Sequence, residues 1–81
     1  MNVKQAKEYV ELGVAQGFRA YRAPMGKGWL LVIDVRRGGG LDGDVLETAL
    51  GVPREFASLD TLYNQVQQLG VQVEELAFST R

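Results

Sequence analysis

The feature that most constrains the fold is residues 29–35, WLLVIDV, which are apolar at six of seven positions. Successive side chains of a strand point to opposite faces of the sheet, so the odd-numbered residues would lie on one face and Leu30 and Val32 on the other. A strand that is apolar on both faces is typical of the centre of a sheet. The run therefore predicts a central strand and the main contribution to the core.

The size of the chain predicts one domain, residues 1–81. A chain of 81 residues hides only about 60–65% of its unfolded surface, which leaves no material for a second core. The balance of 46% hydrophobic and 23% charged residues is that of a globular protein and excludes the disordered class. Because cysteine is absent, stability must come from the core or from subunit pairing. The absence of cysteine also fits a reducing compartment.

Two amphipathic helices are predicted near the ends of the chain. Asn2 is a suitable N-cap for the first, whose apolar residues recur at three- and four-residue spacing as far as Val14, with Gly17 as the expected stop. Ser58 is a suitable N-cap for the second, and Gly70 is its expected end. These two segments predict helices that cover a sheet.

The remaining segments predict the strands of that sheet. Residues 18–23 would form a hairpin with the central strand through the five-residue loop 24–28. Residues 37–44 contain four glycines, whose backbone entropy predicts a flexible connection. Residues 45–50 would then form a third strand, and residues 55–57 a short edge strand.

A closing strand is expected after the second helix, over residues 71–78, with a bulge or twist at Glu74 and Glu75 where the apolar alternation changes parity. The predicted order is α-β-β-β(-β)-α-β. The predicted fold class is therefore α+β, a small, mostly antiparallel sheet with two helices packed on it.

Catalytic chemistry is not expected. Histidine and cysteine are absent, and no nucleophile elbow, phosphate-binding loop or dinucleotide fingerprint occurs. Asp42 and Asp44 flank Gly43, but a calcium loop needs more oxygen ligands, so a solvated turn is the favoured interpretation. We predict no enzyme, no catalytic residue, no cofactor, no metal and no small-molecule substrate.

A basic hairpin is the main candidate for a binding site. Residues 18–37 hold five basic residues and one acidic residue, whereas residues 38–81 hold two basic and seven acidic residues. A basic two-stranded ribbon can follow a phosphate backbone, but the sequence pI near 5.3 is unlike that of an autonomous nucleic-acid domain. The candidate contact residues for a partner are Arg19, Tyr21, Arg22, Met25, Lys27, Arg36 and Arg37.

Several partners fit this hairpin. A protein partner or a second copy of the chain is favoured, and DNA is the other candidate. Met25 at the hairpin tip marks a docking spot for a protein, while Trp29 is expected to fold back onto the core. The longest apolar run, residues 29–33, is too short to span a bilayer, so a cytoplasmic protein without membrane contact is expected.

Three segments, KQAKEYVELG, RAPMGKGWLLV and REFASLDTLYNQV, resemble the small ParC-type partition-associated proteins, some labelled RepB-like, of bacterial plasmids and integrative conjugative elements. The resemblance implies a non-enzymatic accessory role in plasmid or integrative-element maintenance, through protein contacts and, as a second mode, DNA. The glycines from Gly38 and the acidic pair Asp42 and Asp44 depart most from this pattern. The alternative is an interaction or self-assembly module that pairs the basic hairpin with an acidic surface.

Overall fold

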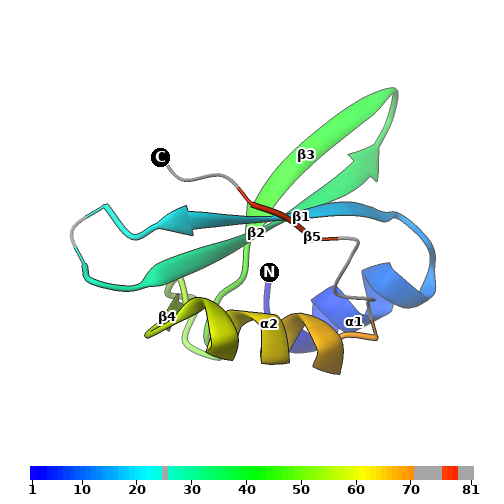
Figure 1. The fold of residues 1–81 in the computed structure, drawn as a ribbon. Helices are drawn as coiled ribbons and strands as arrows, with labels where there is room; N and C mark the ends of the chain where they lie inside the picture. Colours follow the sequence, from blue (N-terminus) through cyan, green and yellow to red (C-terminus); the bar gives the residue numbers. More distant parts are fainter. Residues whose placement is uncertain (25, 71–75, 79–81) are drawn as a thin grey trace.

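The computed structural model describes residues 1–24, 26–70 and 76–78. The helices α1 (Val3–Glu11) and α2 (Leu59–Gln68) lie on one side of a sheet in the order β3-β2-β1-β5, with β4 also paired to β2 (Figure 1). The strands are β1 (Ala15–Arg22), β2 (Trp29–Arg37), β3 (Gly40–Val45), β4 (Glu55–Phe56) and β5 (Leu76–Phe78). Apart from the parallel pair of β1 with β5, all strand pairs are antiparallel. The predicted α+β class and mostly antiparallel sheet are confirmed.

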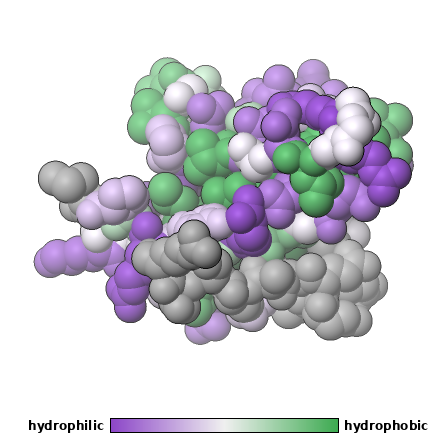
Figure 2. Space-filling model, turned by 90° about the horizontal axis from the view of Figure 1, so that it is seen from above, coloured by the Kyte–Doolittle hydropathy of each residue, from purple (hydrophilic) through white to green (hydrophobic). Residues whose placement is uncertain are grey.

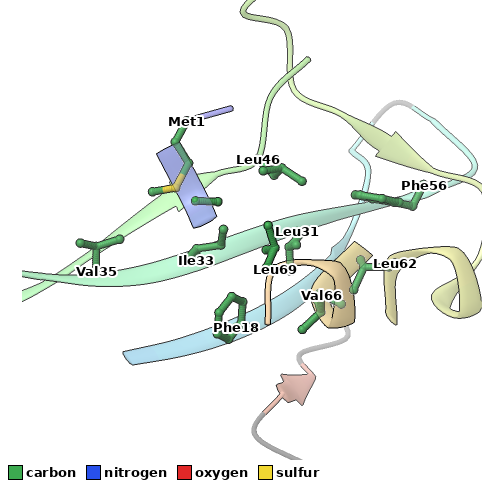
Figure 3. Packing of buried hydrophobic residues seen from close by; sticks show 12 residues of the cluster. Met1, Phe18, Leu31, Ile33, Val35, Leu46, Phe56, Leu62, Val66 and Leu69 are labelled. Atoms are coloured by element: carbon green, nitrogen blue, oxygen red, sulfur yellow. The ribbon is translucent and has the colours of Figure 1, made fainter. Parts of the chain in front are cut away.

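The apolar strand β2 is the centre of the sheet, as predicted. Its neighbours are β1 on one side and β3 and β4 on the other. Leu31, Ile33 and Val35 are buried in the core, whereas Leu30 and Val32 are half-buried on the opposite face. The core is completed mainly by β1, α2 and the segment after β3 (Figure 3), which contribute Phe18, Ala20, Leu46, Leu62, Val66 and Leu69.

The first helix begins as predicted and ends earlier. The Asn2 side chain accepts a hydrogen bond from the Gln5 N–H at 2.9 Å, and the reciprocal bond completes a capping box. The predicted continuation to Val14 with a stop at Gly17 is wrong. Gly13 has φ +74°, a left-handed conformation that ends a helix, and the chain is extended from Ala15 onward.

The glycine-rich segment is ordered, so the flexible connection predicted over residues 37–44 is wrong. Gly38, at φ +57°, and Gly39 form a two-residue turn between the paired residues Arg37 and Gly40. Residues 40–45 then return along β2 as the strand β3. The conformational freedom of glycine serves here to make a tight hairpin turn and not a loose loop.

The third strand therefore lies before the predicted one, because residues 46–50 are not a strand. Val45 is the last residue of β3, and Leu46 is buried with its N–H bonded to the Leu31 carbonyl at 2.8 Å. The chain then turns, with Gly51 at φ +82° and the Thr48 N–H bonded to the Val52 carbonyl at 2.8 Å. This turn interrupts the pairing that a longer strand would need.

The second helix and the edge strand follow the prediction. Ser58 caps α2 by accepting from the Thr61 N–H at 3.3 Å, and Gly70, at φ +92°, follows the C-cap Leu69. The strand β4 pairs with the start of β2, Phe56 opposite Trp29. Of the predicted closing strand, β5 is described, while residues 71–75, with the expected bulge, lie outside the described residues.

Candidate functional site

The candidate residues of the basic hairpin do not form one cluster. Phe18 and Ala20 face the core, so their neighbours Arg19 and Tyr21 point to the side of the sheet that carries no described helix. We call this side of β1, β2 and β3 the open face. Arg22 is three residues from Arg19 on the same strand, so its side chain lies on the opposite face of the sheet. It pairs with Trp29 at the start of β2, whereas Arg36 and Arg37 lie at the end of β2.

Arg19 is held by two partners on the open face. Its Nη2 donates to Asp34 Oδ1 at 2.7 Å, and its Nη1 donates to the Tyr21 hydroxyl. The guanidinium also lies 5.3 Å from the centre of the Tyr21 ring. Gly43 of β3 makes room for it, since a Cβ there would lie 3.0 Å from Arg19 Nη2. The Arg19 guanidinium is therefore part of a packed network that spans β1 to β3.

Arg22 and Trp29 form a second internal contact, on the helix side of the sheet. They face each other across β1 and β2, with the guanidinium 4.8 Å from the Trp29 ring centre. Trp29 also packs against the core cluster, as predicted. Lys27 is exposed in the hairpin loop beside Gly28 and Glu55, and Met25 lies outside the described residues.

Arg37 ties β3 to the first helix. Its Nη2 donates to Asp44 Oδ2 at 2.8 Å, its Nη1 lies 3.6 Å from Asp42 Oδ2, and the guanidinium lies 5.9 Å from the Tyr9 ring centre. Hydrogen bonding to Tyr9 and to Asp44 raises the pKa of Arg37 above its usual value. The favoured solvated turn for Asp42 and Asp44 is wrong, because both carboxylates stand on an ordered strand beside this cation.

Arg36 has no carboxylate or aromatic partner within the described part of the chain. Its Nη2 donates to Gln16 Oε1 at 3.2 Å, and it is exposed. It borders a shallow hollow of about 440 Å³ that is lined by Gln16, Arg36, Gly38, Gly39, Gly40 and Leu41. Among the residues that the structure describes, no three acidic side chains come close enough together to hold a metal ion.

The open face also carries apolar residues that the charge pattern did not indicate. Leu30, Val32 and Val45 are half-buried there, and Leu41 of β3 is 61% exposed. Seen from above, hydrophobic surface appears over the middle of the sheet between hydrophilic side chains (Figure 2). Leu30 also lines a mostly apolar hollow of about 470 Å³, together with Ala23, Pro24, Gly26, Val52, Pro53 and Glu55. The even-numbered apolar residues of the central strand were the sequence signal for this surface.

Replacing Asp34 by alanine is expected to lower the free energy of unfolding by about 1–2 kcal/mol, because a charge-assisted hydrogen bond to half-buried Arg19 is lost. The substitution leaves Arg19 Nη2 without its carboxylate acceptor, beside a buried Nε that already has no hydrogen-bond partner among the described residues. Urea denaturation measures the change. Glu8→Ala removes an exposed carboxylate of α1 and should change stability by less than about 0.5 kcal/mol. Equal losses from the two variants would contradict a structural role for the Arg19–Asp34 pair.

No protein-family model, no curated protein and no solved structure matches this chain. Within the described ranges, neither helix has the length and hydropathy needed to cross a membrane. The mode of binding is therefore inferred from the contacts and charges of the chain's own residues.

Proposed function

We propose that this chain is a non-enzymatic accessory protein that binds another protein through the open face of its sheet. The main support for the proposal is that the charged side chain on this face is paired within the chain, while the apolar side chains are partly exposed. Arg19 is bound to Asp34 and Tyr21, while the apolar side chains beside it, such as Leu30 and Val32, are left partly exposed. An apolar centre with an aromatic residue and an arginine, surrounded by polar side chains, is the usual composition of a protein interface.

A nucleic acid fits the same residues less well. The electrostatic part of phosphate binding comes from lysine and arginine side chains that are free to replace counterions. Arg19 and Arg37 already lie 2.7 and 2.8 Å from carboxylates, and Arg22 lies on the Trp29 ring. The hairpin cations without a carboxylate or aromatic contact within the described part of the chain, Lys27 and Arg36, stand at opposite ends of β2. DNA therefore remains the second candidate partner.

The biological setting that we propose is the maintenance of a plasmid or integrative element, in the cytoplasm. The support is the resemblance of three segments to ParC-type partition-associated proteins. In the structure these segments supply α1, the β1–β2 hairpin loop with the start of β2, and β4 with most of α2. Most of β1, the second half of β2, the β2–β3 turn and β3 lie outside these three segments.

Site-specific photocrosslinking tests the proposal in cells that carry the element. A diazirine analogue of leucine at Leu30, on the open face, is expected to crosslink to one discrete protein. The same analogue at Leu12, which is 73% exposed beyond the end of α1, is the matched control and should give no such product. Crosslinking at both positions alike, or at neither, would contradict binding through the open face.

The DNA alternative has its own measurement. We expect no change in fluorescence anisotropy of a labelled duplex at low salt, since most of the arginines are internally paired. Binding that weakens steeply with added salt, and that is lost on replacing Lys27 and Arg36 by alanine, would favour DNA over protein as the partner.

A further inference from the structure

The strand β3 pairs with β2 along one edge, and its other edge pairs with no strand among the residues that the structure describes. On β2, the Arg36 N–H bonds to Val14 on the β1 side, at 2.8 Å, whereas the Leu31 carbonyl accepts from Leu46 on the β3 side, at 2.8 Å. Because backbone groups alternate along a strand, the odd-numbered residues of β2 bond to β3. The β3 residues opposite them are Gly40, Asp42 and Asp44, which therefore bond to β2.

The other residues of β3 turn their backbone groups away from β2. The Val45 carbonyl shows this directly, since it accepts a hydrogen bond from the N-terminal ammonium of Met1 at 2.9 Å. The N–H and C=O of Leu41 and of Gly43, and the N–H of Val45, point the same way and have no partner within the described part of the chain. In Figure 1 the β2–β3 hairpin rises away from both helices, so no helix covers this edge. Such an edge is a template for another strand.

The side chains of β3 differ sharply between its two faces. Leu41, Gly43 and Val45 lie on the open face, where Val32 of β2 is also exposed in part. Asp42 and Asp44 lie on the other face, where the two carboxylates share the single guanidinium of Arg37. The Asp42 side chain remains 64% exposed. A strand added at this edge would therefore meet apolar groups on one face and an excess of negative charge on the other.

A second copy of the chain does not satisfy this pattern. If two β3 strands paired antiparallel about Gly43, Asp42 of one copy would stand opposite Asp44 of the other. Like charges directly opposite each other destabilise a strand pair. The complementary occupant is a strand that carries basic residues where β3 carries Asp42 and Asp44.

We propose that the open edge of β3 binds an extended segment of a partner protein in which basic and apolar residues alternate, so that the segment adds a strand to the sheet. Its backbone bonds to Leu41, Gly43 and Val45, its basic side chains meet Asp42 and Asp44, and its apolar side chains continue the open face. This inference rests on the proposed protein-binding function and specifies the chemistry of the partner.

The test is an NMR titration of the isotope-labelled chain with a short peptide in which lysine and valine alternate. We expect the largest shifts at the amides of Leu41 and Gly43, and no binding of a matched peptide with glutamate in place of lysine. Leu41→Pro removes an outward N–H without removing a bond to β2, and is expected to weaken binding about tenfold relative to Leu41→Ala. Amide spectra of both variants show whether β3 is retained.

A second variant serves if Leu41→Pro disturbs the hairpin. Replacing Asp42 and Asp44 together by asparagine should weaken peptide binding several-fold and reduce its salt dependence. Equal binding of the lysine and glutamate peptides, or a chain that dimerises through β3 by light scattering and NMR, would overturn the inference. If Leu30 gives a crosslink but the peptide does not affect β3, only the proposal of a partner strand at β3 is contradicted. If Leu30 gives no crosslink, the proposal of protein binding through the open face is contradicted.

Discussion

Replacing Leu31 by alanine is expected to lower the free energy of unfolding by about 2–5 kcal/mol. Leu31 is 0% exposed in the first half of the central strand, and it lies among core residues from α2 and the segment after β3 (Figure 3). The substitution removes buried methyl groups and leaves a cavity that both sheet and helix would have to move to fill. Small domains are stabilised by only about 5–15 kcal/mol, so this one change removes a large share.

Urea denaturation followed by circular dichroism measures this effect. Leu50→Ala is the matched control, because Leu50 is 90% exposed in the loop after β3 and should change stability by less than about 0.5 kcal/mol. A Leu31→Ala protein that is as stable as Leu50→Ala would contradict the placement of β2 at the centre of the core.

The second large effect is expected at Gly28, where the β1–β2 hairpin meets β4. A Cβ at this position would lie 2.4 Å from the Phe56 carbonyl oxygen, a backbone atom that a rotamer change cannot move. The Gly28 N–H also donates to Glu55 Oε1 at 3.2 Å, so β4 is held against the start of β2. Gly28→Ala is therefore expected to cost about 1–3 kcal/mol by forcing the two segments apart.

Gly39→Ala provides the matched control, because a Cβ there meets no atom within 4 Å. We expect it to change stability by less than about 0.5 kcal/mol in the same denaturation experiment. If Gly28→Ala were as harmless as Gly39→Ala, the close approach of β4 to the hairpin would be disproved.

The elements that depend on local sequence could be predicted. The central strand followed from its apolar run, and the second helix from Ser58, its apolar stripe and Gly70. The strand β3 could not, because its composition of glycine and aspartate disfavours a strand locally. The strand β3 is held by contacts outside its own residues, which are the turn at Gly38, the ladder with β2 and the ion pairs of Arg37.

The candidate site was predicted in part. Strand alternation alone separates Arg19 and Tyr21 from Arg22, and this separation was available from the sequence. The partners of the arginines could not be predicted from the sequence. The Arg19–Asp34 pair depends on the register of β1 with β2, and the contacts of Arg37 depend on the register of β2 with β3. Basic residues that are close in sequence thus make separate contacts with other residues of the same chain. The expected binding surface is therefore the open face and the edge of β3 rather than the basic residues.

The proposal of a partner strand depends on β3 being an ordered strand with one free edge, and amide hydrogen exchange of the free chain, read residue by residue by NMR, tests that claim most directly. The amides of Asp42 and Asp44, bonded to β2, should exchange slowly, and those of Leu41 and Gly43, which face the open edge, should exchange fast. Fast exchange at all four residues would show that this segment is a loose loop, and slow exchange at all four would show that the edge is already covered. Either result would contradict the account.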